Sequence, residues 1–344
     1  MANNLVIRAL KANSKSFNLS SKKMTDVPKS VARLTTISTL RLNNNSLTTL
    51  PVELRTLQRL TELNLGNNAL EEIPSVLKYL NSLKKLYLFG NHITRLPPEV
   101  LEGLHNLTLL NLNHNHISVL PPEIKSLSNL ETLSLLDNQL EELPVEIGFL
   151  KKMVEINLTN NELGRLPKQI YSLSQLARLY LARNNLTELP EGVIGLMKLR
   201  VLDVAGNRLS MFPVDFQFLA LNELLCEGNT FVKSKLMESV QAVEVLSLKE
   251  LSARQILVED RNRFSMVHLA LSYHPGLGLL LADRGTCALC LQPFLTTWLE
   301  CVRFINLRKD MKMKSSQTIP VRALLCSYQC FNKSGHSYYG VASV

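Results

Sequence analysis

The chain has 344 residues, of which 46% are hydrophobic, and its formal net charge is +9 at pH 7. This composition excludes a wholly disordered chain. No stretch reaches the roughly 20 apolar residues that span a bilayer, and the N-terminus lacks the apolar core and cleavage site of a secretory signal. We therefore expect an intracellular protein, cytoplasmic with the nucleus left open, that has no membrane partner and keeps its thiols reduced.

The first two thirds of the chain repeat the pattern LxLxxNxL with a period of 22 to 24 residues. This period is that of leucine-rich repeats, in which each unit adds one short strand and stacks on its neighbours. The pattern predicts an α/β fold over residues 1–231: a right-handed leucine-rich repeat solenoid of about ten short parallel strands, with a degenerate, polar first unit as its cap. The repeated asparagines are Asn45, Asn68, Asn91, Asn115, Asn138, Asn161, Asn184, Asn207 and Asn229.

The fixed positions of the repeat each have a physical role. Strand leucines such as Leu63 and Leu65 are expected to point inward, where stacking with neighbouring repeats buries them. The asparagine is expected to satisfy backbone groups where the chain leaves the strand, and so to form a buried ladder. Proline, as at Pro51 and Pro97, is expected to begin the convex segment, because the strand must end there.

The outward strand residues, with those at the strand exits, form a surface that we call the concave face. Most of its residues are polar and uncharged, but some are aromatic or aliphatic and are not needed by the core. Such side chains on a rigid surface typically anchor protein partners, and scattered surface residues without a function are the alternative. The predicted partner-binding residues are Arg41, Asn64, Tyr87, Phe89, Asn111, His114, Leu136, Asn157, Tyr180, Arg183 and Asp203.

The leucine period stops after Asn229, and residues 232–283 are predicted to form a helical cap or linker. Their apolar spacing indicates an amphipathic helix, whose simplest role is to cover the open end of the solenoid. The apolar positions of this helix are Val245, Leu248, Leu251, Ile256 and Leu257.

Residues 232–344 also carry most of the excess charge, with 14 Lys and Arg against 8 Asp and Glu. These basic residues are scattered, apart from the run RKDMKMK at 308–314. A solvated loop explains that run better than a nucleic-acid surface, so we expect no nucleic-acid partner.

Five of the six cysteines fall within residues 284–344. Cys287 and Cys290 form C-x2-C, and Cys326 and Cys330 form C-x3-C. Between the pairs, TTWLECVRFI and TIPVRALLC are typical of two strands joined by a basic loop. A cysteine knuckle, a hairpin and a second pair at a short helix resemble a treble-clef site. The sequence therefore predicts one structural zinc ion held by four thiolates, with buried, unliganded cysteines as the alternative.

The sequence does not indicate an enzyme, because it has no phosphate-binding glycine loop, no nucleophile elbow and no HExxH motif. Catalysis would require a reactive cysteine with a lowered pKa, and Cys301 is the first candidate. Its alternation with Trp298 and Phe304 predicts a core position in a strand instead. We expect a non-enzymatic module that binds a protein partner on the concave face.

The stretch SLKELSARQIL, followed by a cysteine-bearing tail, is similar to the C-terminal region of leucine-rich repeat substrate receptors of Elongin–Cullin ubiquitin ligases. The resemblance implies an Elongin-binding helix in which Leu248 inserts into a groove of the partner. It also implies Elongin B–Elongin C and a Cullin as partners. Ser252 stands where the family prefers cysteine, and a plain capping helix is the alternative. The residues that match the Elongin-binding helix are Ser247, Leu248, Ser252 and Ile256.

Overall fold

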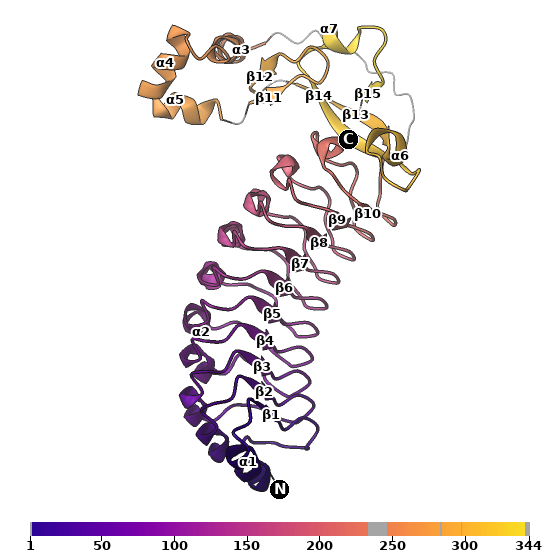
Figure 1. Cartoon of the computed structure of the whole chain (residues 1–344). Helices are drawn as coiled ribbons and strands as arrows, with labels where there is room; N and C mark the ends of the chain where they lie inside the picture. Colours follow the sequence, from indigo (N-terminus) through magenta and orange to yellow (C-terminus); the bar gives the residue numbers. More distant parts are fainter. Residues whose placement is uncertain (1, 233–245, 283, 297, 341–344) are drawn as a thin grey trace. The chain divides into compact units, whose positions relative to one another are not determined.

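The computed structural model describes residues 2–232, 246–282, 284–296 and 298–340. Their contacts define two compact units (Figure 1). Unit 1 comprises residues 1–209 and 218–230, and unit 2 comprises residues 210–217 and 231–344.

Unit 1 is built on one ten-stranded parallel sheet in which the strands follow the order of the chain. Each strand pairs in register with the same position of the next repeat, so that Leu63 lies between Leu40 and Leu86. The predicted solenoid of ten short parallel strands is therefore confirmed. The strands are β1 (Ser16–Asn18), β2 (Thr39–Arg41), β3 (Glu62–Asn64), β4 (Lys85–Tyr87), β5 (Leu109–Asn111), β6 (Thr132–Ser134), β7 (Glu155–Asn157), β8 (Arg178–Tyr180), β9 (Val201–Asp203) and β10 (Glu223–Leu225).

Short helices follow one another along the other side of unit 1 (Figure 1). Pro51 and Pro97 each directly precede such a helix, as predicted, because proline cannot continue the strand. The repeat with the longest spacing, 24 residues, has a full α-helix, α2 (Pro98–Gly103). The others have 3-10 helices: η1 (Lys29–Arg33), η2 (Val52–Thr56), η3 (Ser75–Tyr79), η4 (Pro122–Ser126), η5 (Val145–Phe149), η6 (Lys168–Ser172) and η7 (Val193–Gly195).

The core of unit 1 lies between the sheet and these helices. The strand leucines, among them Leu63 and Leu65, are fully buried. The asparagine ladder is also as predicted. The side-chain amide of Asn138 donates to the carbonyls of Leu112 (3.0 Å) and Leu135 (3.1 Å), and its oxygen accepts from the N–H of Ile117 (3.1 Å). The buried ladder asparagines, from Asn68 to Asn207, thus join adjacent repeats through their backbone groups in the core.

The N-terminal cap contains a helix that the sequence did not lead us to expect. Helix α1 (Ala2–Lys11) precedes β1 and buries Val6 and Ala9, while Ile7 and Leu10 stay exposed. Because the buried face consists of so few apolar residues, the repeat pattern did not reveal it.

Unit 2 combines a helical segment with a small β segment, and the two strands predicted on either side of the basic loop are present as an antiparallel pair. No helix in the described part of either unit is long and apolar enough to cross a membrane. The elements are α3 (Leu248–Asp260), α4 (Met266–Tyr273), α5 (Pro275–Leu280), β11 (Gly285–Thr286), β12 (Pro293–Phe294), β13 (Leu299–Asn306), α6 (Leu307–Asp310), β14 (Thr318–Leu325), α7 (Tyr328–Phe331) and β15 (Tyr338–Gly340).

Residues 210–217 belong to unit 2, although the leucine period places them in a repeat. The backbone of Phe212 pairs with β14, donating to the carbonyl of Pro320 (2.9 Å) and accepting from the N–H of Arg322 (2.8 Å). The Phe212 ring also packs against the rings of Phe216 and Phe231. Because of these contacts with residues distant in the sequence, residues 210–217 pack in unit 2, although their leucine spacing is that of a repeat.

Candidate functional site

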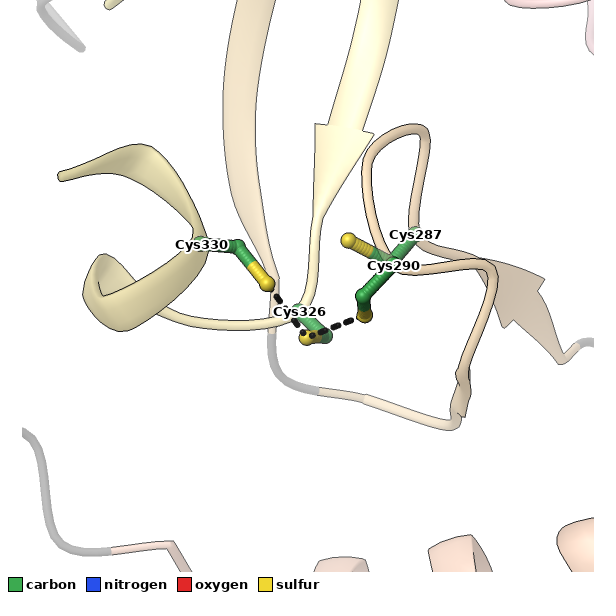
Figure 2. Close-up of side chains that lie close together, drawn as sticks. All are labelled: Cys287, Cys290, Cys326 and Cys330. Atoms are coloured by element: carbon green, nitrogen blue, oxygen red, sulfur yellow. Dashed lines mark hydrogen bonds between the residues drawn. The ribbon is translucent and has the colours of Figure 1, made fainter. Parts of the chain in front are cut away.

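Four cysteine side chains meet in unit 2 (Figure 2). Cys287 and Cys290 lie on the turn between β11 and β12, Cys326 directly follows β14, and Cys330 lies in α7. The four sulfur atoms all lie within 4.8 Å of one another. The Sγ of Cys326 is 3.5 Å from the Sγ of Cys290 and 3.6 Å from the Sγ of Cys330. The structure thus brings together all four residues that the sequence singled out for a metal.

This cysteine quartet fits a tetrahedral metal ion. Four sulfurs at about 2.3 Å from one zinc ion are about 3.8 Å apart, close to the observed separations. All six cysteines of the chain are free thiols, so none of the four is committed to a disulfide. Four thiolates fill the coordination sphere and leave no position for a substrate. The quartet can therefore hold a structural metal ion that links the β11–β12 turn to the β14–α7 junction.

The backbone around the quartet prepares one thiol for ionisation. Burial raises the pKa of Cys287, but N–H groups of Cys290, Cys326 and Leu289 directed at its sulfur outweigh burial and lower that pKa to about 7. Burial raises the pKa of Cys326 and of Cys330. Metal binding here would consequently release protons, and its affinity would rise with pH.

Cys301 does not have the properties of a catalytic thiol. It lies in β13 opposite Ala323 and Gly340, and it is 1% exposed. Burial and the charge of Glu300 raise its pKa to about 12. Cys301 is therefore a core residue, as its alternation with Trp298 and Phe304 predicted, and the condition for a reactive nucleophile is not met.

The sheet of unit 1 presents the predicted concave-face residues in neighbouring positions. Tyr87 lies between Asn64 and Asn111, and Tyr180 lies between Asn157 and Asp203. The central residue of every strand of this sheet is buried, whereas these outward residues are half-buried. Leu136 is also half-buried, and Arg41, His114 and Arg183 are exposed.

Phe89 also supports the sheet. A Cβ atom added to Gly66 would lie within 2.5 Å of the Phe89 ring, so the ring packs directly on the Gly66 backbone. Phe89 is half-buried in this contact. Besides its predicted place among the partner-binding residues, Phe89 packs one repeat on the previous one.

The polar residues of the concave face have local partners as well. The side-chain oxygens of Asn64, Asn111 and Asn157 each accept a hydrogen bond from the N–H two residues further on, at 3.0 Å. Asp203 does the same with the N–H of Ala205 at 3.1 Å, and burial raises its pKa. These residues fix the backbone at the strand exits.

His114 and Arg183 occupy one edge of the concave face. The residue before each ladder asparagine has a positive φ, and it is 55° for His114 and 54° for Arg183. The imidazole of His114 lies 2.8 Å from the carboxylate of Asp137 in the next repeat. Hydrogen bonds from His114 and Asn160 lower the pKa of Asp137. At this edge, polar side chains of successive repeats are therefore hydrogen-bonded to one another, as His114, Asp137 and Asn160 are.

The predicted Elongin-binding residues lie at the beginning of α3. Ser247 caps the helix by accepting from the N–H of Glu250 at 3.2 Å. Leu248 is 83% exposed and Ser252 is also exposed, while Ile256 packs against the core of unit 2. The structure therefore places Leu248 and Ser252 outward and separates Ile256 from them.

The amphipathic pattern assigned to this helix is wrong in part. Leu248 and Leu251 are exposed, and the buried face of α3 consists of Glu250, Ala253 and Leu257. The remaining position of the pattern, Val245, lies outside the described residues. A charged residue on the buried face weakens the apolar periodicity of the helix, so periodicity does not reveal that Glu250 is a core residue.

An apolar surface on α4 and α5 was also missed. Neither helix has a fully buried residue, and most of their large apolar side chains are exposed, although Leu271 packs against the core cluster of α3. The signal was present as a stretch without Asp, Glu, Lys or Arg over residues 266–282. The exposed residues of this surface include Phe264, Met266, Leu269, Tyr273, Leu279 and Leu280.

The comparisons with known proteins agree with this architecture. The family model "Leucine rich repeat" matches residues 32–93, 81–140 and 151–209. Leucine-rich repeat-containing protein 69 of Xenopus laevis is 45% identical over 132 residues, and that of Mus musculus is 42% identical over 133 residues. Each alignment covers 38% of this chain and 38% of the relative, so the match spans well under two thirds of either protein.

Solved structures show the same repeat fold. A leucine-rich repeat protein of Leptospira interrogans has a TM-score of 0.62 and 34% identity, over 65% of this chain and 58% of its own. TLR13 in complex with ssRNA13 has a TM-score of 0.57 and 25% identity, over 66% of this chain and 38% of its own.

The repeat period, the ten-stranded parallel sheet and the family match lead to one conclusion. Residues 32–140 and 151–209 match the leucine-rich repeat family model, unit 1 has the leucine-rich repeat fold, and the chain is similar to leucine-rich repeat-containing protein 69.

Proposed function

We propose that this chain is a non-enzymatic adaptor that binds a protein partner on the concave face of unit 1. The supporting observation is the half-exposure of Tyr87, Leu136 and Tyr180 on a sheet that the asparagine ladder holds rigid. Aromatic residues on such a surface contribute much binding energy because little side-chain entropy is lost. Their polar neighbours supply amide donors at the edge of the same contact.

Affinity capture from cells with wild-type protein and with Tyr87→Ala/Tyr180→Ala tests this proposal. We expect a partner that the wild type retains and that the double variant binds at least tenfold more weakly, since two central aromatics each contribute about 1–2 kcal/mol or more. The matched control is Tyr79→Ala, an exposed tyrosine on the helical side of unit 1. Equal loss of the partner with Tyr79→Ala, or full retention by the double variant, would contradict the proposal.

A second function is favoured by unit 2, namely that of a substrate receptor that docks Elongin B–Elongin C through α3. Leu248 is a large apolar side chain left exposed at the first turn of a capped helix, and helices that dock into grooves present such residues. Helices α4 and α5 also carry exposed apolar residues, and exposed apolar patches mark protein interaction sites. The concave face would then select the substrate, and a zinc ion in the cysteine quartet would hold unit 2 together.

A pull-down of purified Elongin B–Elongin C by the intact protein tests the second function. We expect binding by the wild type and its loss, by at least tenfold, in Leu248→Asp, because a charge cannot enter an apolar pocket without large desolvation cost. Folding should be unaffected, since the side chain is already in water. Val119→Asp, at an exposed position of unit 1, is the charge-matched control. No binding by folded wild-type protein would leave α3 without this role.

A further inference from the structure

Glu250 is a completely buried carboxylate on α3 that accepts hydrogen bonds from Arg254, Leu295 and Thr296. Its Oε1 accepts from the Nε of Arg254 (2.7 Å) and from the N–H of Leu295 (3.0 Å). Its Oε2 accepts from the N–H (2.6 Å) and the hydroxyl (2.9 Å) of Thr296. Burial raises the pKa of Glu250, but these donors outweigh burial and lower that pKa to about 2, so the carboxylate is charged. A buried charge of this kind is stable only while all its donors stay in place.

The donors of Glu250 are connected to the cysteine quartet by two routes. The first route is through Arg254, whose guanidinium also donates to the backbone carbonyl of Cys326 at 3.0 Å. Cys326 is one of the four predicted metal ligands. A single arginine therefore joins the buried carboxylate of α3 to a ligand residue.

The second route follows the β11–β12 hairpin. The N–H of Cys287 donates to the carbonyl of Gln292 at 2.9 Å and closes the turn that carries the first cysteine pair. Three consecutive residues then have three different surroundings. Phe294 packs in the core around the cysteine quartet, Leu295 packs in the core of α3, and Thr296 binds Glu250. A displacement of the hairpin would move the donors of Glu250.

We propose that metal binding at the cysteine quartet fixes α3 in place through Glu250 and Arg254. The first turn of α3, with its exposed Leu248, would then be held in position for a partner only when the quartet binds a metal ion. The ion fixes the positions of the β11–β12 turn and of Cys326. The turn leads to Leu295 and Thr296, and the carbonyl of Cys326 binds Arg254, so both hold donors of Glu250 in place. Without the ion, the donors move apart, water reaches the carboxylate and α3 separates from the hairpin. The docking role of the Leu248 face rests on the second proposed function, whereas the coupling between ion and helix stands without it.

Hydrogen–deuterium exchange of the full-length protein tests this coupling and requires no partner. Wild type, Glu250→Gln and Glu250→Ala are compared with one equivalent of Zn²⁺ bound and after chelation. The matched control is Glu259→Gln, at an exposed position of the same helix. Peptides from β13 and β14 serve as an internal reference for the fold of unit 2. Metal content is measured in parallel.

In the wild type, we expect chelation to raise exchange in residues 248–260 at least tenfold, and added Zn²⁺ to restore protection. In Glu250→Gln the glutamine amide opposes one of the N–H donors, so exchange of α3 should rise by a similar factor with one Zn²⁺ still bound and β13–β14 protected. Glu259→Gln should behave as the wild type. Chelation that leaves α3 protected, or a Zn²⁺-loaded Glu250→Gln with wild-type protection of α3, would overturn the proposal. Loss of protection in β13–β14 in both zinc-loaded Glu250 variants would also overturn it, because Glu250 would then hold the whole unit.

These readouts separate the coupling from the docking function. If the exchange results are as expected and Elongin B–Elongin C does not bind, the coupling stands and the identity of the partner is wrong. If Elongin B–Elongin C binds and chelation leaves α3 protected, the docking function stands and the coupling is wrong.

Discussion

Cys326→Ser is expected to abolish stoichiometric zinc binding and to destabilise unit 2, releasing α3 from the β11–β12 hairpin, while unit 1 stays folded. A structural zinc ion contributes about 10–16 kcal/mol of apparent binding free energy to small domains at pH 7, and this energy is available only with a complete ligand set. Unit 2 has a modest core around the quartet, so packing alone should offset only part of this loss. Metal analysis gives the stoichiometry.

The fold of unit 2 can be followed with the one tryptophan of the chain. Trp298 lies 5.6 Å from Phe294, whose ring packs against the quartet, so its fluorescence should change when the centre is lost. Cys301→Ala is the matched control, because Cys301 lies in the same core and is not near enough to belong to the quartet. We expect this control to keep one zinc ion per chain. A wild type without metal, or a Cys326→Ser variant with a full equivalent, would show that the cysteines are core residues and not ligands.

Asn138→Ala is expected to destabilise unit 1 by about 3 kcal/mol or more. The substitution leaves the N–H of Ile117 and the carbonyls of Leu112 and Leu135 without their side-chain partner in a buried environment. A buried polar group without a partner costs about 1–3 kcal/mol. Because each repeat is stable only through its neighbours, the loss should weaken the whole array. Urea denaturation followed by far-UV circular dichroism measures the change.

The control for this variant is Gln139→Ala at the adjacent, exposed position. Its side chain is in water, so we expect a change within about 0.5 kcal/mol. A similar effect of both substitutions would mean that the ladder contributes no more than the exposed turn beside it. Trp298 fluorescence, recorded in the same titration, shows whether unit 2 unfolds separately.

The sequence by itself determined the repeat array and the residues of the candidate metal centre. Nine asparagines at a near-constant period, with leucines and prolines at fixed offsets, encode the same local structure in each repeat. The prediction of the fold therefore does not depend on assigning any single repeat correctly. The two cysteine pairs and the alternating strands between them were also local patterns. Each pair is a short-range pattern, the first at the β11–β12 turn and the second at the β14–α7 junction, and the strands predicted between them pair as the β13–β14 hairpin.

Only the tertiary structure decided the rest. Residues 210–217 join β14 because Phe212 binds Pro320 and Arg322 across more than a hundred residues, against the local leucine period. Phe89 lies on Gly66 of another repeat, and the exposed Leu248 and the buried Glu250 exchange the roles that hydropathy assigned to them. A buried charge is stable when donors from distant segments converge on it, and for Glu250 these are Leu295 and Thr296. Periodicity describes neighbours along one element, so it does not contain such partners.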